Sequence, residues 1–117
     1  MNDMPQFCAS RLVTPLVCVR LDRFEIPVWC NLEFLNPSGS TKDRIARYIL
    51  TKAMRQKRLA AGDLVVEASS GSTSIALALS CARLGLRFQA VMPVGVSRER
   101  VMMIGAFGAT VELTPQE

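Results

Sequence analysis

The sequence contains no histidine, and its four cysteines, at positions 8, 18, 30 and 81, form no Cys-x-x-Cys pair. A Ser-His-Asp triad is therefore impossible within this chain, and a zinc site would have only cysteine or carboxylate ligands. Cys18 and Cys30 lie in apolar, strand-like runs, and Cys81 lies in an apolar helical run. Reduced thiols in a core explain these positions better than disulfides or a metal site, so we expect no bound metal.

Long apolar runs are also missing. No segment approaches the length of a transmembrane helix, and the N-terminal residues MNDMPQFCASR lack the apolar region of a signal peptide. We therefore expect no membrane association, and the cytoplasm is the default location.

Charge and aromatic residues are both modest. The formal net charge is +4, and much of the excess lies between Arg44 and Arg58. That segment has a single aromatic residue, Tyr48, and no interleaving of aromatic and basic residues. The solvated face of a surface helix is a simpler interpretation than a nucleic-acid footprint, so we expect no nucleic-acid partner.

Strands and helices alternate along the chain with short connections. Strands are expected at residues 16–19, 28–34, 64–68, 88–92 and 111–113, and helices at 40–59, 75–84 and 97–107. We expect Gly62 and Gly85 to close the first two helices. This alternation predicts an α/β fold: an open, mostly parallel sheet with flanking helices on both faces and right-handed crossovers.

Residues 36–44, NPSGSTKDR, connect the second strand to the first helix. Pro37 and Gly39 form the turn, and Ser40 precedes Asp43 by three residues, the spacing of a capping box. Lys42 then falls in the first helical turn, where the helix dipole disfavours a cation. We call residues 36–41 the lysine turn.

The helical neighbours of Lys42 are Ile45, Ala46 and Ile49, so the lysine is expected on the apolar face. Burial and a helix N-terminus both lower the pKa of an amine, and a Schiff-base lysine needs a lowered pKa. The alternative is a lysine that lays its stem on apolar surface and keeps its amine in water.

A second candidate site follows the strand at 64–68. Residues 69–74, Ser-Ser-Gly-Ser-Thr-Ser, form what we call the hydroxyl loop. Its N–H groups and hydroxyls at a helix N-terminus could bind a phosphate or a carboxylate, although Ser72 or Thr73 could instead only cap the helix. Ligands gather at the carboxyl ends of parallel strands, so Lys42 and this loop should face one crevice. An amine beside an anion site suggests an imine-forming, charged cofactor and an acid-bearing substrate.

Four segments carry a resemblance to a known family: TPLV from Thr14, NPSGSTKDR, EASSGSTSIALA from Glu67, and the run from Met92 to Thr114. Together they resemble the N-terminal portion of the cysteine synthase and cystathionine β-synthase family, the fold-type II pyridoxal-phosphate (PLP) enzymes. The resemblance implies that Lys42 is the catalytic residue and binds the cofactor, pyridoxal 5'-phosphate. It also implies that Ser69, Ser70, Gly71 and Thr73 bind the substrate carboxylate.

One position departs from the family pattern. Ser72 stands where the family has an asparagine that contacts the ring hydroxyl of the cofactor. A serine can still donate a hydrogen bond, but its reach is shorter, which affects the reaction subtype more than the choice of cofactor. We therefore keep Ser72 among the expected cofactor-binding residues.

The resemblance further implies a β-replacement or β-elimination enzyme that acts on a small amino acid, with sulfide addition to an activated serine preferred. Cysteine desulfhydrase-like and diaminopropionate synthase-like lyases remain open, as does a non-catalytic remnant or interaction module. Residues 1–35 would begin the larger domain, and residues 36–117 would form an incomplete, small mobile domain. The 117-residue fragment is expected to be inactive alone, and the full-length protein to be a homodimer.

Overall fold

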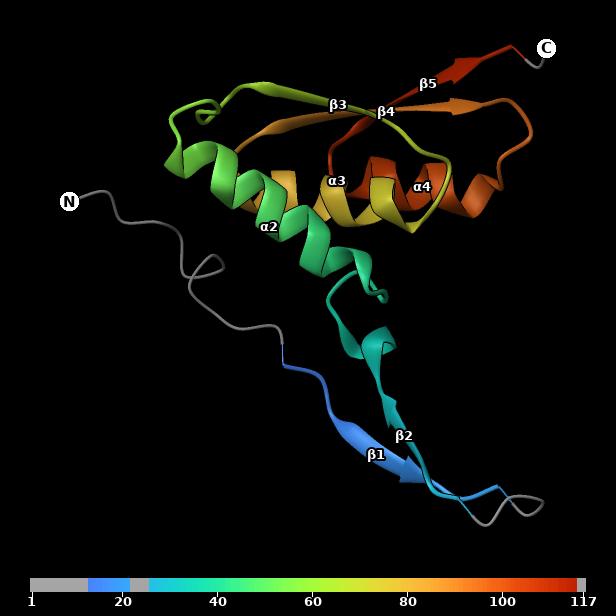
Figure 1. Ribbon diagram of the computed structural model, residues 1–117. Helices are drawn as coiled ribbons and strands as arrows, with labels where there is room; N and C mark the ends of the chain where they lie inside the picture. The colour runs from blue at the N-terminus through green and yellow to red at the C-terminus, as the bar shows by residue number, and fades with distance from the viewer. Residues whose placement is uncertain (1–12, 22–25, 116–117) are drawn as a thin grey trace.

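The computed structural model describes residues 13–21 and 26–115, which form an antiparallel hairpin and a larger α/β unit (Figure 1). In the hairpin, β1 (Leu16–Val19) pairs with β2 (Val28–Asn31). The 3-10 helix η1 (Glu33–Leu35) follows. The first strand agrees with the sequence prediction, but the second is shorter than 28–34. Pro15, whose carbonyl accepts the Leu32 N–H at 2.9 Å, has no N–H with which to extend the ladder.

The larger unit follows the predicted alternation. Its elements are β3 (Leu64–Ala68), α3 (Ser72–Leu84), β4 (Arg87–Pro93), α4 (Arg98–Ala106) and β5 (Thr110–Thr114). The three strands are parallel in the order β3-β4-β5, with Ala68 opposite Val91 and Pro93 opposite Thr114. The prediction of an α/β fold with a parallel sheet is confirmed.

The prediction that helices cover both faces of the sheet is wrong for the described residues. All helices of the larger unit lie on one side of the sheet (Figure 1). Phe88, Ala90 and Met92 point to that side and are buried, whereas Val66 on the opposite face is 52% exposed. The two crossovers have the same handedness, and each one moves to the next strand in the same direction across the sheet. Their helices therefore lie on the same face. The sequential strand order therefore leaves the second face without helices.

The hydrophobic core lies between this sheet, α3 and α2 (Lys42–Arg55). α3 is buried on nearly all sides, as its apolar sequence predicts, and it packs against α2 through Ala46 and Leu50. None of the helices in the described part of the chain is long and apolar enough to span a membrane.

The helices differ from the prediction at the start of α3, which begins at Ser72 rather than at residue 75, and at both ends of α2. Gly85 terminates α3 in a left-handed conformation, φ 68°, as expected. By contrast, α2 ends at Arg55 rather than near 59, and Lys57 adopts φ 57° just beyond it. Gly62, at φ 88°, lies in the turn before β3, where its N–H bonds to the Gly85 carbonyl at 2.7 Å. Gly62 therefore does not close α2.

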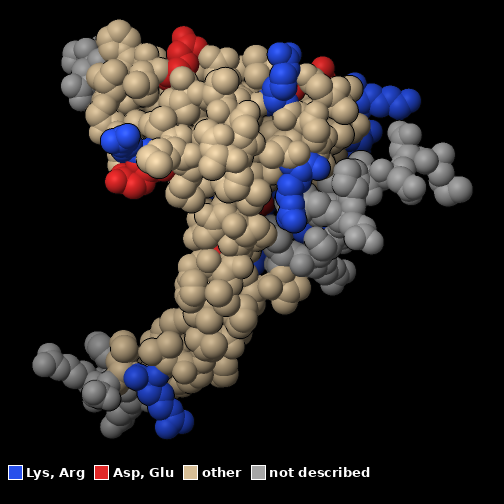
Figure 2. Space-filling view, turned by 180° about the vertical axis from the view of Figure 1, so that it is seen from behind, with Lys and Arg blue, Asp and Glu red and all other residues tan. Residues whose placement is uncertain are grey.

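The hairpin exposes large apolar side chains on both faces, and few charged atoms are visible on this part of the molecule in Figure 2. Trp29 is 63% exposed, and Phe34 in the adjoining η1 is 65% exposed. Because the exposure of apolar groups to water is unfavourable, the hairpin surface is suited to contact further protein.

The cysteines do not all lie in the core. Cys81 is buried, Cys30 is half-buried and Cys18 is exposed, so the core prediction is wrong for Cys18. Cys8 lies outside the described residues. In the hairpin register Cys18 is opposite Trp29 and Cys30 is opposite Val17. Since adjacent positions point to opposite faces of a strand pair, Cys18 and Cys30 cannot bond to each other without a change of register.

These environments predict a large difference in thiol reactivity. Burial raises the pKa of the Cys81 thiol from 9.0 to about 12, which lowers its thiolate fraction about a thousandfold at pH 8. We expect a thiol reagent to label Cys18 rapidly and Cys81 only after denaturation, as measured by peptide mapping. Equal labelling rates of Cys18 and Cys81 in the native protein would contradict this burial.

Candidate functional site

The helices α2, α3 and α4 all begin at the end of the molecule where β3 and β4 finish (Figure 1). The lysine turn leads into α2 and the hydroxyl loop leads into α3. The two segments singled out in the sequence therefore lie at the same end of the fold, the end at which parallel sheets bind ligands.

Backbone hydrogen bonds shape the lysine turn. The Gly39 N–H donates to the Asn36 carbonyl at 2.8 Å, and Gly39 has φ 82°, which a side chain would strain. The Asn36 side chain is buried and donates to the Ser40 carbonyl at 3.0 Å. The turn is therefore held at its middle and at its end.

The predicted capping box between Ser40 and Asp43 is wrong. The Ser40 hydroxyl accepts the Lys42 N–H at 3.2 Å, while the Asp43 carboxylate binds Ser38 instead. Thr41 occupies the N-cap position and has helical backbone angles, so the chain already turns into the helix before the expected box can form.

Lys42 begins α2 and is half-buried. Of its predicted apolar neighbours, Ala46 is buried, but Ile45 and Ile49 are 46% and 53% exposed. The face that carries Lys42 therefore lies at the edge of the core rather than within it. No carboxylate in the described ranges forms an ion pair with Lys42. Within those ranges, no salt bridge competes with a ligand for the amine.

A polar cluster connects α2 to the segment that precedes it. Arg44 donates to the Glu33 carboxylate from Nε and Nη2 at 2.9 Å each, and also to the Thr14 hydroxyl at 2.8 Å. The hydrogen bonds from Arg44 lower the pKa of Glu33, and those from Asn36 and Thr14 act in the same direction. The bond to Glu33 in turn raises the pKa of Arg44. This cluster fixes the start of α2 relative to the hairpin.

The hydroxyl loop is anchored at both of its ends. The Ser69 N–H donates to the Val91 carbonyl at 3.1 Å, and the Ser74 hydroxyl donates to the Ser69 carbonyl at 2.6 Å. Gly71 is the N-cap residue of α3, and no side chain caps that helix. The alternative in which Ser72 or Thr73 caps α3 is therefore wrong.

The middle of the loop has donors that the fold does not use. The first N–H groups of a helix have no acceptor within it, and those of Ser72 and Thr73 are of this kind. The hydroxyls of Ser70, Ser72 and Thr73 take part in none of the hydrogen bonds found among the described residues. These half-buried donors at the positive end of a helix dipole can bind an anion.

Sequence reasoning missed Arg100 as a neighbour of this loop. From the first turn of α4, its guanidinium donates to the Ser70 carbonyl at 3.1 Å. The two residues are thirty positions apart, and only the packing of α4 beside α3 brings them together. Arg100 therefore adds a positive charge at the border of the hydroxyl loop.

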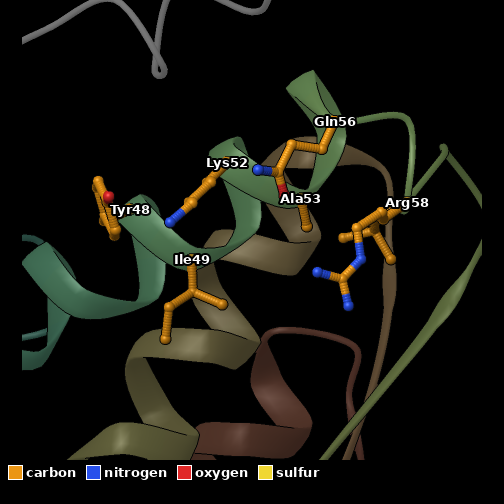
Figure 3. Close-up of a pocket in the computed structure, with 7 residues that line it drawn as sticks. Tyr48, Ile49, Lys52, Ala53, Gln56 and Arg58 are labelled. Carbon is orange, nitrogen blue, oxygen red and sulfur yellow. The ribbon is translucent and has the colours of Figure 1, made fainter.

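A hollow of about 360 Å³ lies elsewhere, along the outer face of α2 (Figure 3). It is lined by Tyr48, Ile49, Lys52, Ala53, Gln56, Arg58 and Leu59. The Lys52 amine lies 5.5 Å from the centre of the Tyr48 ring, a cation–π arrangement. Neither Lys42 nor any residue of the hydroxyl loop lines this hollow, so it is separate from the candidate site.

Comparison with known proteins gives consistent matches. A family model described as pyridoxal-phosphate dependent enzyme matches residues 10–117. Cysteine synthase B of Campylobacter jejuni is 47% identical over 106 residues, which make up 91% of this chain and 36% of that protein.

Solved structures of related enzymes also match this chain. O-ureido-L-serine synthase superposes with a TM-score of 0.87 at 37% identity, covering 93% of this chain and 35% of that one. A hydrogen sulfide-producing enzyme from Fusobacterium nucleatum superposes with a TM-score of 0.83 at 38% identity, covering 87% and 34%. This chain thus spans about a third of the length of the relatives that it matches.

Proposed function

The chain belongs to the family of pyridoxal-phosphate dependent enzymes, and we propose that it carries the lysine and the carboxylate-binding loop of a β-replacement enzyme. The preferred reaction joins sulfide to an activated serine and gives cysteine. In that reaction a C–S bond forms at the β-carbon, the bond to the serine oxygen breaks, and the activating group leaves with that oxygen. The observation that supports this most is the identity of 47% with a cysteine synthase over most of this chain.

The candidate site fits PLP in two respects. Lys42 offers an amine with no ion-pair partner among the described residues, and the hydroxyl loop offers unused donors at a helix N-terminus. When bound, PLP supplies an electron sink that stabilises negative charge at the α-carbon of an amino acid.

The residues of this chain take separate roles in the proposal. The Lys42 amine holds the cofactor and, once released from it, moves a proton at the α-carbon of the substrate. Ser69, Ser70, Gly71 and Thr73 bind and orient the substrate carboxylate, and Ser69 does so through its hydroxyl because its N–H donates to the Val91 carbonyl. Ser72 would donate a hydrogen bond to the ring hydroxyl of the cofactor.

The reaction can be tested on the purified protein that carries this chain. With PLP, an O-acylated serine and sulfide, we expect cysteine to form, measured by a colorimetric assay. The second candidate is release of hydrogen sulfide from cysteine, which the likeness to the Fusobacterium nucleatum enzyme favours. A protein that binds PLP but catalyses neither reaction would contradict both proposals.

Ser72→Asn tests the subtype separately. An asparagine reaches further than a serine, so it should hold the ring hydroxyl differently. We expect a shifted visible absorbance maximum or a changed ratio of cysteine formation to elimination. Ser80→Ala in the same helix is the matched control, because Ser80 is buried in α3 away from the loop. Identical spectra and product ratios in wild type and Ser72→Asn would remove Ser72 from the cofactor site.

The wider organisation is part of the same proposal. Residues 1–35 begin the larger domain and residues 36–117 form the small mobile domain, which the separation of the hairpin from the α/β unit supports (Figure 1). The exposed apolar side chains of the hairpin support a homodimer. The proposed substrate is a small amino acid, and we propose no nucleic-acid or membrane partner. The proposed location is the cytoplasm, since the free thiols of Cys18 and Cys30 fit a reducing compartment.

A further inference from the structure

Asp43 is the most deeply buried charged residue of the described chain, with 1% of its surface exposed. It lies in the first turn of α2, directly after Lys42. A buried carboxylate is costly unless donors compensate it, and no lysine or arginine of the described residues pairs with Asp43. Its compensation must therefore come from hydrogen bonds and from the helix N-terminus.

Those hydrogen bonds come from one residue within the lysine turn, Ser38. Asp43 Oδ2 accepts the Ser38 N–H at 3.0 Å and the Ser38 hydroxyl at 2.6 Å. The second oxygen, Oδ1, is buried and has no hydrogen-bond partner. If Asp43 served only to pack the core, the fold would be more stable with a side chain that lacks this unpaired oxygen.

The two bonds to Asp43 close a short ring of backbone. The ring starts at Ser38 and contains Gly39, Ser40, Thr41 and Lys42 before it returns at Asp43. Because Lys42 immediately precedes the residue that closes the ring, its Cα can shift little while both bonds persist.

We propose that Asp43 is a positioning residue for Lys42: through Ser38 it fixes the lysine turn, so that the amine is presented in one place. This inference rests on the proposed role of Lys42. A loosened turn would leave the amine intact but would spread its positions, and well-oriented groups react far faster than mobile ones.

Two variants of the protein that carries this chain test the proposal. Ser38→Ala removes one donor, and Asp43→Asn keeps the shape but removes the charge, which weakens both bonds. Thr41→Ala is the matched control, because Thr41 is the neighbouring hydroxyl residue and its side chain makes no capping bond. The readouts are hydrogen exchange of residues 36–43 and the initial rate at which PLP and borohydride modify Lys42, with Lys52 as the internal reference.

We expect both variants to speed exchange in the turn and to slow modification of Lys42 about tenfold relative to Lys52. The double variant should be no slower than Asp43→Asn, because the two residues act through the same bonds. Thr41→Ala should match the wild type. If Lys42 of the wild type is modified and both variants react at its rate, the positioning role is wrong and the proposed function stands. If the wild type carries no pyridoxyl group on Lys42, the proposed function fails and this inference fails with it.

Discussion

Replacing Lys42 with alanine is expected to abolish the visible absorbance band of PLP in the protein that carries this chain, and to lower activity by about 10²–10⁴-fold. Of the lysines, only Lys42 lies in a first helical turn at the end of the fold where the hydroxyl loop is found. Alanine keeps the helix intact because it has the highest helix propensity. The loss of the band and of activity should therefore result from the missing amine and not from a less stable α2.

Lys52→Ala is the matched control on the same helix. Lys52 is exposed and its amine lies over the Tyr48 ring, in the hollow away from the candidate site. The band should survive this change. Borohydride reduction followed by peptide mapping identifies the modified residue directly. A pyridoxyl group on Lys52 or Lys57 of the wild type, in place of Lys42, would end the assignment.

Leu50→Ala is expected to lower the free energy of unfolding of the α/β unit by about 2–5 kcal/mol. Leu50 is 2% exposed and joins α2 to α3 in the core. The substitution removes buried methyl groups and leaves a cavity that the two packed helices cannot close fully. Since α2 carries Lys42 and α3 carries the hydroxyl loop, their relative position should loosen as well.

The midpoint of urea denaturation measures this loss, and hydrogen exchange locates it. Exchange should rise most in α2 and in the first turns of α3. Ile49→Ala is the control, because Ile49 is the preceding residue of the same helix and is 53% exposed. Its effect should stay within about 1 kcal/mol. Equal losses for Leu50→Ala and Ile49→Ala would mean that α2 does not pack against α3 through Leu50.

The pattern of apolar residues predicted the α/β unit well. Strand β3 and the end of α3 at Gly85 follow directly from local sequence, because a short apolar run bounded by turn residues and a left-handed glycine are both local signals. The end of α2 does not. Lys57 adopts the left-handed angle that glycine usually takes, and the turn before β3 instead uses Gly62. Which of two candidate positions ends a helix depends on packing that the local sequence does not contain.

The sequence predicted that Lys42 and the hydroxyl loop lie at the same end of the fold, but it did not predict the hydrogen bonds around them. Lys42 and the hydroxyl loop were located because each combines turn residues with the start of a helix. Arg100 and Asp43 were not assigned their partners, since the Ser70 carbonyl is remote in sequence and Ser38 replaces the expected Ser40. Their roles depend on how far the chain bends at Gly39 and on where α4 lies beside α3.

The sequential order of β3, β4 and β5 also bears on how the protein forms during synthesis. Each strand pairs with the next strand along the chain, as when Leu64 meets Arg87 and Gln89 meets Thr110. Every pairing therefore closes a loop of only one crossover, and the entropy lost in closing a loop grows slowly with its length. Pairing with the next strand keeps the contact order lower than pairing with a more distant strand would, and a lower contact order favours faster folding. The sheet can thus grow one strand at a time as the ribosome releases each crossover, without waiting for a distant segment to arrive.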